Sequence, residues 1–381
     1  MSINPSDLFN FLKKKNIDFF TGVPDSLLKN FCLCINDNTS SNNHIITANE
    51  GNAIGLAAGY HLASGKLPLV YFQNSGLGNI VNPLLSLCDR DIYSIPMLLF
   101  IGWRGEPGVK DEPQHIKQGK IQIDLLRTME IPYDIISKND LDIENKINKG
   151  IKTAKNLKSP FAIIVKKDSF NKYNSSAKIE NINKSLMSRE SSLKVILENI
   201  PNNSIVVSTT GKTSREIFEI REKNFESHNK DFLTVGSMGH CSSIALGIAI
   251  AKPNRNVICI DGDGSLIMHM GSIATIGKSR LPNIHHLLLN NQVHDSVGGQ
   301  KTSADIIDFS KLFKANSYKN TFYADNKSLL KSNVKMMFNK KGPNFLEVLI
   351  KPGSRNNLGR PTIKPVDNKI SFMNYINNLE S

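Results

Sequence analysis

The sequence contains few cysteines and no long uninterrupted apolar segment. None of its apolar runs approaches the roughly 20 residues that a membrane-spanning helix needs, so no membrane span is expected. Residues 1–16 also lack a basic head followed by an apolar core and a small-residue cleavage site, so a secretory signal peptide is not expected. These absences predict a soluble protein of the cytoplasm.

The cysteines do not form a recognisable disulfide or zinc pattern. Their number, five, is odd, and no pair has the C-x-x-C spacing. The adjacent His285 and His286 have no H-E-x-x-H or C-x-x-C partner, so a zinc site is not expected. All five cysteines are predicted to be reduced residues of the core or of helices, and they are Cys32, Cys34, Cys88, Cys241 and Cys259.

The chain carries a formal net charge of +13, which raises the question of nucleic-acid binding. However, its lysines are scattered, clusters such as residues 13–15 are short, and aromatic residues do not alternate with them. We therefore expect no nucleic-acid partner and interpret the charge as a general surface property. A positive surface also raises the local concentration of an anionic substrate.

The length of 381 residues suits two domains, and the pattern indicates that both are α/β. Short apolar runs alternate with amphipathic stretches, which is typical of parallel sheets covered by helices on both faces. We predict two doubly wound domains, residues 1–168 and 186–381, joined by a polar linker at residues 169–185. Sites in such folds lie beyond the carboxyl ends of the strands. Residues at these predicted ends include Asp25, Glu50, Asn74, Gly236, Asp263 and Asn291.

A buried strand at residues 257–260 runs into Asp261-Gly262-Asp263-Gly264-Ser265. Glycines let a backbone approach a ligand closely, and a carboxylate such as Asp263 is a hard oxygen ligand for Mg²⁺. The next strand ends at Asn290 and Asn291, which follow Asp263 by 27 and 28 residues. A strand–helix–strand unit returns the chain to the same sheet edge. The asparagines are therefore expected beside Asp263.

This arrangement resembles the fingerprint of the thiamine-diphosphate-dependent 2-oxo acid decarboxylases, in which Gly-Asp-Gly precedes Asn-Asn by just under thirty residues. The resemblance implies that Asp263, Asn291 and the carbonyl of Val293 bind Mg²⁺, with Asn290 as an alternative to Asn291. Gly262, Gly264 and Ser265 would contact the diphosphate. In Gly236-Ser237-Met238-Gly239, the family likeness implies that Met238 supports the bent cofactor and that the Gly236 carbonyl accepts from its amino group.

Glu50 ends a predicted strand directly before a helix rich in alanine and glycine. It resembles the family glutamate that hydrogen-bonds the pyrimidine ring of the cofactor. Alone, Glu50 is better explained as an acid at a helix N-terminus. Together with the other motifs, it predicts that residues 1–168 bind the pyrimidine end and residues 186–381 the diphosphate end.

The chain lacks the middle domain of longer family members, and so resembles the phosphonopyruvate and sulfopyruvate decarboxylases. Five stretches carry the likeness, at residues 21–26 (TGVPDS), 102–108 (GWRGEPG), 111–115 (DEPQH), 208–216 (STTGKTSRE) and 294–300 (HDSVGGQ). They imply decarboxylation of 3-phosphonopyruvate to phosphonoacetaldehyde and CO₂, a step of phosphonate biosynthesis. Sulfopyruvate is the alternative substrate. A non-catalytic protein of this fold, or a basic binding protein, is the remote alternative.

A small, anionic 2-oxo acid requires cationic partners, and arginine matches phosphonate oxygens best. Arg104 is the first candidate, followed by Arg355 and Arg360. The resemblance further implies that Asp25 assists proton transfer, and either His115 or His294 is expected to relay protons. It also implies a homodimer or higher homo-oligomer with active sites between subunits, because Glu50 and Asp263 would come from different chains.

Overall fold

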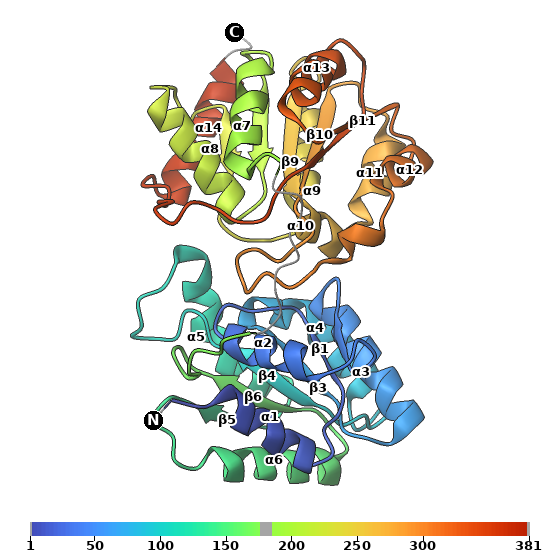
Figure 1. Cartoon of the computed structure of the whole chain (residues 1–381), viewed down its shortest axis with the longest axis vertical. Helices are drawn as coiled ribbons and strands as arrows, with labels where there is room; N and C mark the ends of the chain where they lie inside the picture. Colours follow the sequence, from blue (N-terminus) through green and yellow to red (C-terminus); the bar gives the residue numbers. More distant parts are fainter. Residues whose placement is uncertain (1, 176–184, 379–381) are drawn as a thin grey trace. The chain divides into compact units, whose positions relative to one another are not determined.

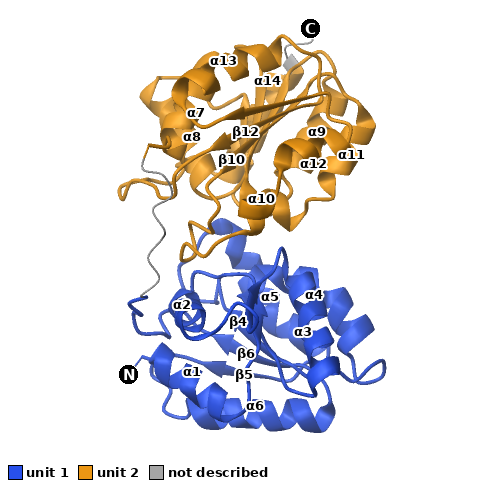
Figure 2. Ribbon diagram, turned by 45° about the vertical axis from the view of Figure 1, so that its right-hand side comes forward, with its two compact units in different colours: residues 1–178 blue, residues 179–381 orange. Residues whose placement is uncertain are grey.

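The computed structural model describes residues 2–175 and 185–378, and the chain divides into two units, residues 1–178 and 179–381 (Figure 2). Residues 176–184 of the predicted linker lie outside the described part of the chain. Of its remaining residues, Phe170 stacks on Phe31 with ring centroids 5.5 Å apart and forms a bridge with Ile3. The start of the predicted linker therefore packs against unit 1.

Unit 1 is a six-stranded parallel sheet in the order β2-β1-β3-β4-β6-β5 (Figure 1). Helices α1, α2 and α6 pack on one face, and α3, α4 and α5 pack on the other. The strands are β1 (Phe20–Gly22), β2 (His44–Ile46), β3 (Leu69–Gln73), β4 (Leu98–Gly102), β5 (Tyr133–Ile136) and β6 (Phe161–Val165). The helices are α1 (Pro5–Lys14), α2 (Lys29–Asn38), α3 (Glu50–Ser64), α4 (Leu77–Pro83), α5 (Pro113–Thr128) and α6 (Ile143–Leu157), with short turns η1 (Asn74–Gly76) and η2 (Leu84–Cys88).

Unit 2 repeats this architecture with a sheet in the order β11-β12-β10-β9-β7-β8. Helices α7, α8 and α13 pack on one face, and α9 to α12 with α14 on the other. The strands are β7 (Ile205–Ser208), β8 (Asp231–Leu233), β9 (Val257–Gly262), β10 (Ile284–Asn290), β11 (Asn320–Ala324) and β12 (Asn344–Leu349). The helices are α7 (Arg189–Asn199), α8 (Lys212–Lys223), α9 (Cys241–Ala251), α10 (Asp263–Met268), α11 (Ser272–Ser279), α12 (Phe309–Ala315), α13 (Lys327–Phe338) and α14 (Pro365–Asn378), with the turn η3 (Ser303–Ile306).

The local signals explain where elements begin. The Asn4 side chain accepts a hydrogen bond from the Ser6 N–H at 2.9 Å, and Pro5 occupies the first turn of α1, so the sequence Asn-Pro explains why the helix begins there. The strands that the sheets bury on both faces are continuous apolar runs, such as Phe161–Val165. The prediction that both halves are doubly wound, with helices on both faces of a parallel sheet, is confirmed.

The strand registers decide which residues meet at the sheet edges. In unit 1, Gln73 pairs with Gly102, so β3 and β4 end together. In unit 2, Leu289 pairs with Gly262, so Asn290 lies level with Asp263. Each sheet therefore gathers its polar residues at the carboxyl ends of its central strands.

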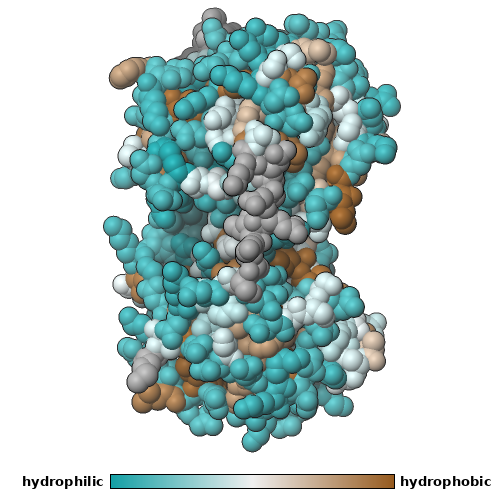
Figure 3. Space-filling model, viewed as in Figure 1, coloured by the Kyte–Doolittle hydropathy of each residue, from teal (hydrophilic) through white to brown (hydrophobic). Residues whose placement is uncertain are grey.

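The outer surface is mainly polar. The face drawn in Figure 3 is largely hydrophilic, with hydrophobic residues in separate small patches. None of the described helices combines the length and the apolar character that a membrane crossing requires. All five cysteines are buried and reduced, as predicted.

Candidate active site

Glu50 is the first residue of α3 and is 5% exposed. The Asn79 amide donates to its Oε2 at 2.7 Å, which fixes the carboxylate at the carboxyl edge of the unit 1 sheet. The backbone of Gly76 passes so close that a Cβ there would lie 2.4 Å from the Glu50 carboxyl carbon. A side chain at position 76 would therefore displace the Glu50 carboxylate. The Asn74–Asn79 turn therefore works as a support for Glu50.

Asp25 follows β1 and is completely buried. Its carboxylate accepts a hydrogen bond from the Gln73 amide at 2.7 Å and from the Leu27 and Leu28 N–H groups at 3.1 and 3.3 Å. Burial raises the pKa of Asp25 above its ordinary value, despite these hydrogen bonds and the nearby Arg104. Asp25 is consequently a carboxyl group that retains a proton more readily than an exposed aspartate.

Arg104 follows β4 and forms a two-pronged ion pair with Asp111, with N–O distances of 2.8 and 2.5 Å. A third contact joins its Nη1 to the Ser26 hydroxyl at 3.0 Å. The Asn74 side chain bonds both the carbonyl and the N–H of Arg104 and so holds its backbone. The sequence reasoning did not single out Asp111 as a site residue, although it lies in one of the resembling motifs.

His115 lies in the first turn of α5, near the same edge. Burial, reinforced by the charge of Arg104, lowers the pKa of His115 to about 4. Its Nδ1 is buried without a hydrogen-bond partner among the described residues. A neutral imidazole with an unsatisfied nitrogen can accept or pass on a proton.

In unit 2, Asp263 begins α10 and is 3% exposed. The Thr302 hydroxyl donates to its Oδ2 at 2.5 Å, and the Asn291 backbone N–H also donates to the carboxylate. Burial raises the pKa of Asp263 to about 6, because the hydrogen bonds only partly offset the loss of solvent. A buried anion of this kind is stabilised by a cation.

The two asparagines beside Asp263 point to different partners. The Asn290 amide donates to Glu347 on β12 at 2.8 Å. The Asn291 Oδ1 accepts from the Val293 N–H at 3.2 Å, so the Asn291 side chain belongs to the loop next to Asp263. Gln292, between Asn291 and Val293, has a left-handed backbone (φ 61°), which lets the loop turn sharply.

The turn that follows β8 meets α10 at Ser265. The Ser265 hydroxyl accepts from the Gly239 N–H at 3.1 Å and from the Thr209 hydroxyl at 2.9 Å. Met238, in this turn, is half-buried, and Gly236 lies just before it. Three separate strand ends, those of β7, β8 and β9, therefore converge on one serine.

His294 faces α10, because a Cβ on Gly264 would lie 3.3 Å from its imidazole. Burial lowers the pKa of His294 to about 4. The following residue, Asp295, fixes the loop through Arg189 at 3.2 Å and Lys212 at 3.3 Å. Arg189 in turn forms a buried pair with Glu216 at 2.9 Å. No sequence motif predicted this anchor, because its members come from three distant segments.

The other two candidate arginines lie in the segment after β12. The Arg355 guanidinium contacts Glu190 at 3.1 Å and forms a second, shorter contact with Glu219. Its charge is therefore shared with two carboxylates of α7 and α8. Arg360 is exposed. The role of both arginines in substrate binding stays a prediction.

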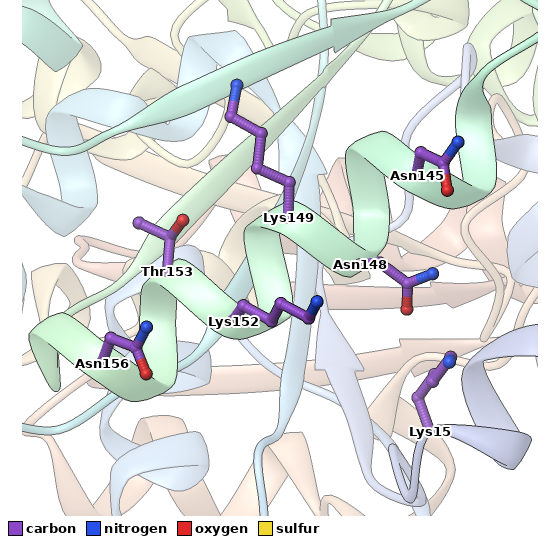
Figure 4. Close-up of a pocket in the computed structure, with 7 residues that line it drawn as sticks. All are labelled: Lys15, Asn145, Asn148, Lys149, Lys152, Thr153 and Asn156. Carbon is purple, nitrogen blue, oxygen red and sulfur yellow. The ribbon is translucent and has the colours of Figure 1, made fainter.

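A hollow of about 410 Å³ in unit 1 contains none of the predicted site residues. Lysines, asparagines and a threonine line it, mostly from one exposed side of α6 (Figure 4), and they are Lys15, Asn145, Asn148, Lys149, Lys152, Thr153 and Asn156. The wall contains no carboxylate, thiol or imidazole. It therefore lacks the groups that general acid–base catalysis or metal binding requires.

The predicted ligands fit thiamine diphosphate and Mg²⁺ on chemical grounds. Asp263 and the side-chain oxygen of Asn291 are hard oxygen donors in one loop cluster, as Mg²⁺ requires. Glu50 is a single buried carboxylate held in one orientation, which suits a hydrogen bond to a heterocycle. The individual residue roles remain predictions.

Comparison with known proteins agrees with this chemistry. Residues 6–126 match the family described as the N-terminal TPP binding domain of thiamine pyrophosphate (thiamine diphosphate) enzymes, and residues 210–348 match the C-terminal TPP binding domain.

Similar proteins align over nearly the whole chain. A phosphonopyruvate decarboxylase of Streptomyces viridochromogenes is 30% identical over 387 residues, which cover 98% of this chain and 95% of that protein. A second, from Streptomyces hygroscopicus, is 30% identical over 95% of this chain and 91% of its own length. A sulfopyruvate decarboxylase of Methanosarcina acetivorans is 26% identical over 93% of both chains. The chain therefore belongs to the thiamine pyrophosphate enzyme family, with both of its TPP binding domains matched, and to the decarboxylases within it.

Proposed function

We propose that this chain catalyses the thiamine-diphosphate- and Mg²⁺-dependent decarboxylation of 3-phosphonopyruvate to phosphonoacetaldehyde and CO₂, as a step of phosphonate biosynthesis. The observation that carries this proposal is the 30% identity to two phosphonopyruvate decarboxylases over 98% and 95% of the chain. The sulfopyruvate decarboxylase is less similar, at 26%, so sulfopyruvate is the second candidate substrate.

In the reaction, the bond between carbons 1 and 2 breaks, carbon 1 leaves as CO₂, and carbon 2 takes up a proton. Bound thiamine diphosphate supplies the carbon nucleophile and the electron sink. Glu50 orients the pyrimidine ring by a hydrogen bond, and Asn79 keeps the carboxylate in place. Mg²⁺ is held by Asp263 and Asn291 with the Val293 carbonyl.

We assign Asn291 rather than Asn290 to the metal because of their hydrogen bonds. The Asn290 amide is engaged with Glu347, and this contact turns it toward β12. Asn291 and Asp263 belong to one loop cluster, in which the Asn291 N–H already donates to the Asp263 carboxylate. Ser265, Gly262 and Gly264 then adjoin the diphosphate, while Gly236 and Met238 contact the rest of the cofactor.

Protonation of carbon 2 needs a donor, and Asp25 is our first choice. Burial raises the pKa of Asp25, so this carboxyl group keeps its proton to a higher pH than an exposed aspartate does and can act as the donor. His115 and His294 are both neutral at pH 7, since the pKa of each is about 4, and either can relay a proton to Asp25 or to product.

Arg104 binds the phosphonate in this proposal. A guanidinium has five N–H donors, of which three are engaged with Asp111 and Ser26 in the described contacts. The other donors are sufficient for two phosphonate oxygens. Asp111 would then act as the partner that keeps the guanidinium plane fixed.

The test is CO₂ release by the purified protein with thiamine diphosphate and Mg²⁺, with phosphonopyruvate, sulfopyruvate and pyruvate compared at equal concentration. We expect a kcat/KM for phosphonopyruvate at least tenfold above that for the other two acids, and loss of turnover after chelation of Mg²⁺. A preference for sulfopyruvate would keep the chemistry and change the substrate. Absence of metal-dependent turnover with all three acids would refute the proposal.

We further propose a homodimer or larger homo-oligomer in which Glu50 of one chain and Asp263 of another serve the same cofactor. Co-expression of Glu50→Gln and Asp263→Asn chains tests this. Each variant alone is inactive, whereas a mixed dimer contains one intact site if the two residues come from different chains. Random pairing should restore about a quarter of wild-type activity. No recovery in a purified mixed dimer would show that both residues of a site come from one chain.

A cytoplasmic location belongs to the same proposal. It is supported by the five buried, reduced cysteines, which suit a reducing compartment.

A further inference from the structure

Four chemically reactive side chains lie together inside unit 2, beneath the loop that carries Asp263. They are Cys241 of α9, Cys259 and Asp261 of β9, and His286 of β10, and each is 0–2% exposed. Side chains alternate along a strand, so Cys259 and Asp261 point to the same sheet face. His286 pairs with Cys259 in the register, and α9 covers this face.

The distances within the cluster are short. The sulfur atoms of Cys241 and Cys259 are 3.3 Å apart. One ligand atom each from Cys241, Cys259 and Asp261 lies within 4.8 Å of the others. The His286 Nε2 is 3.6 Å from the Asp261 Oδ2. Atoms of the first three residues are thus close enough to contact one small central ion, and the imidazole of His286 adjoins Asp261 at the edge of this group.

Several polar atoms of the cluster have no hydrogen bond. Asp261 uses only Oδ1, which accepts from the Gly262 N–H at 2.9 Å. Its Oδ2 and both ring nitrogens of His286 are buried and make no hydrogen bond among the described residues, although the Oδ2 and the Nε2 face each other at 3.6 Å. A buried polar atom left unsatisfied costs about 1–3 kcal/mol, so three at one point require an explanation.

We propose that Cys241, Cys259, Asp261 and His286 bind one divalent transition metal ion, with zinc as the best match, in a structural site separate from the Mg²⁺ site. Two thiolates, one imidazole and one carboxylate are all ligands that zinc accepts, and four protein ligands without an open position are typical of structural sites. Tetrahedral ligands about 2.0–2.3 Å from zinc lie about 3.3–3.8 Å from one another. The sulfur atoms, 3.3 Å apart, are about 0.5 Å closer than this geometry needs, and the nitrogen and oxygen, 3.6 Å apart, are about 0.3 Å farther, so metal binding would shift both pairs slightly.

A disulfide between Cys241 and Cys259 explains less. It would need the sulfur atoms about 2.05 Å apart, and it would give Asp261 and His286 no contact beyond their own at 3.6 Å. A divalent metal would bind the thiolates and the carboxylate and would offset most of their buried negative charge.

The proposed ion would also stabilise the predicted active site. It would join β9 to β10, and these strands end at Asp263 and Asn291. The loops that are proposed to bind Mg²⁺ would then follow two strands that the ion cross-links within the core. The sequence spacing did not indicate this site because its ligands come from three separate elements.

The experiment uses the full chain without a histidine tag, grown with zinc and purified with thiamine diphosphate and Mg²⁺. We expect about one zinc per chain by mass spectrometry of the metals after exhaustive dialysis, since structural zinc is held tightly. Protein grown with Co²⁺ should show the near-ultraviolet absorption of thiolate-to-cobalt charge transfer. Cys259→Ser should lose most of this band and of the metal. Cys88→Ser is the matched control, because Cys88 is also fully buried but belongs to unit 1.

Three results would overturn the proposal. The first is wild-type protein with less than a tenth of a zinc or cobalt ion per chain. The second is an intact mass lighter by two hydrogens, which would indicate a disulfide. The third is an unchanged cobalt spectrum in Cys259→Ser. If Cys259→Ser does not fold, the wild-type metal content and the thiolate–cobalt band decide alone.

Discussion

Replacing Asp263 by asparagine should stabilise the metal-free protein and abolish its response to Mg²⁺. The carboxylate is 3% exposed and accepts hydrogen bonds from Thr302 and from the backbone of Asn291. Asparagine has nearly the same shape and keeps an acceptor oxygen, but it carries no charge. It therefore resembles the protonated aspartate, which is the form that burial favours.

The size of the effect follows from the pKa. Burial raises the pKa of Asp263 from 3.8 to about 6, and each pKa unit corresponds to about 1.4 kcal/mol. At pH 8 the ionised carboxylate thus costs the metal-free fold about 3 kcal/mol. The stabilising contribution of the protonated form is complete below pH 3.8 and is lost as the pH rises through about 6. The gain in unfolding free energy of Asp263→Asn over the wild type should therefore fall to about half of its pH 8 value at pH 5.

The measurement is urea unfolding in the presence of EDTA at pH 5 and pH 8. The single tryptophan, Trp103, lies in unit 1, so its fluorescence follows that unit and serves as an internal control. Far-ultraviolet circular dichroism reports both units, and the variant should shift only the transition that fluorescence does not follow. Adding Mg²⁺ with thiamine diphosphate should stabilise the wild type by mass action but not the variant.

Two outcomes would refute this reasoning. If Asp263→Asn is less stable than the wild type at pH 8 in EDTA, the ionised carboxylate is not a burden on the fold. If Mg²⁺ stabilises the variant as much as the wild type, Asp263 is not a metal ligand. A gain that is equal at pH 5 and pH 8 would show that titration of Asp263 is not its cause.

Three further substitutions, two of them with a matched control variant, test the remaining assignments. Glu50→Gln should lower kcat by about 10²–10⁴-fold with an unchanged thermal transition, and substantial activity would contradict its role. Gly76→Ala should lower kcat at least tenfold in steady-state kinetics, because its Cβ would lie 2.4 Å from the Glu50 carboxyl carbon. Gly78→Ala is the control: its Cβ would enter open space, so kcat should not change. Asn291→Ala should raise the Mg²⁺ concentration for half-maximal activity about 10–100-fold. Asn290→Ala should instead cost about 1–3 kcal/mol of unfolding free energy, from the loss of its bond to Glu347. If Asn290→Ala rather than Asn291→Ala weakens the response to Mg²⁺, Asn290 is the metal ligand.

The sequence predicted the central strands but not all of the edges. Strands such as β3, β4, β6 and β9 are buried on both faces, so their residues form continuous apolar runs. The two strands that were not predicted, β5 and β11, lie at sheet edges, and most of their residues are only partly buried. An edge strand needs less apolar surface, and its sequence signal is correspondingly weaker.

The same distinction applies to the candidate site. Asp263 and Asn291 were predicted to lie together because both follow adjacent strands, and the strand register alone brings them level. The supports of these residues could not be predicted in this way. Thr302 reaches Asp263 from a loop, and Arg189 reaches Asp295 from a helix 106 positions earlier. Such contacts depend on loop paths and side-chain rotamers, which strand periodicity does not specify.

The cluster of Cys241, Cys259, Asp261 and His286 illustrates where sequence patterns cease to be informative. Spacing rules detect metal sites whose ligands lie close together in one short segment. Here two ligands alternate along one strand, while register and helix packing supply the others, so no motif of fixed spacing exists. Each residue alone looks like an ordinary member of the core. Only the three-dimensional structure shows that these side chains lie together, with several of their polar atoms making no hydrogen bond among the described residues. The metal content of the purified protein is therefore informative even before any activity is measured.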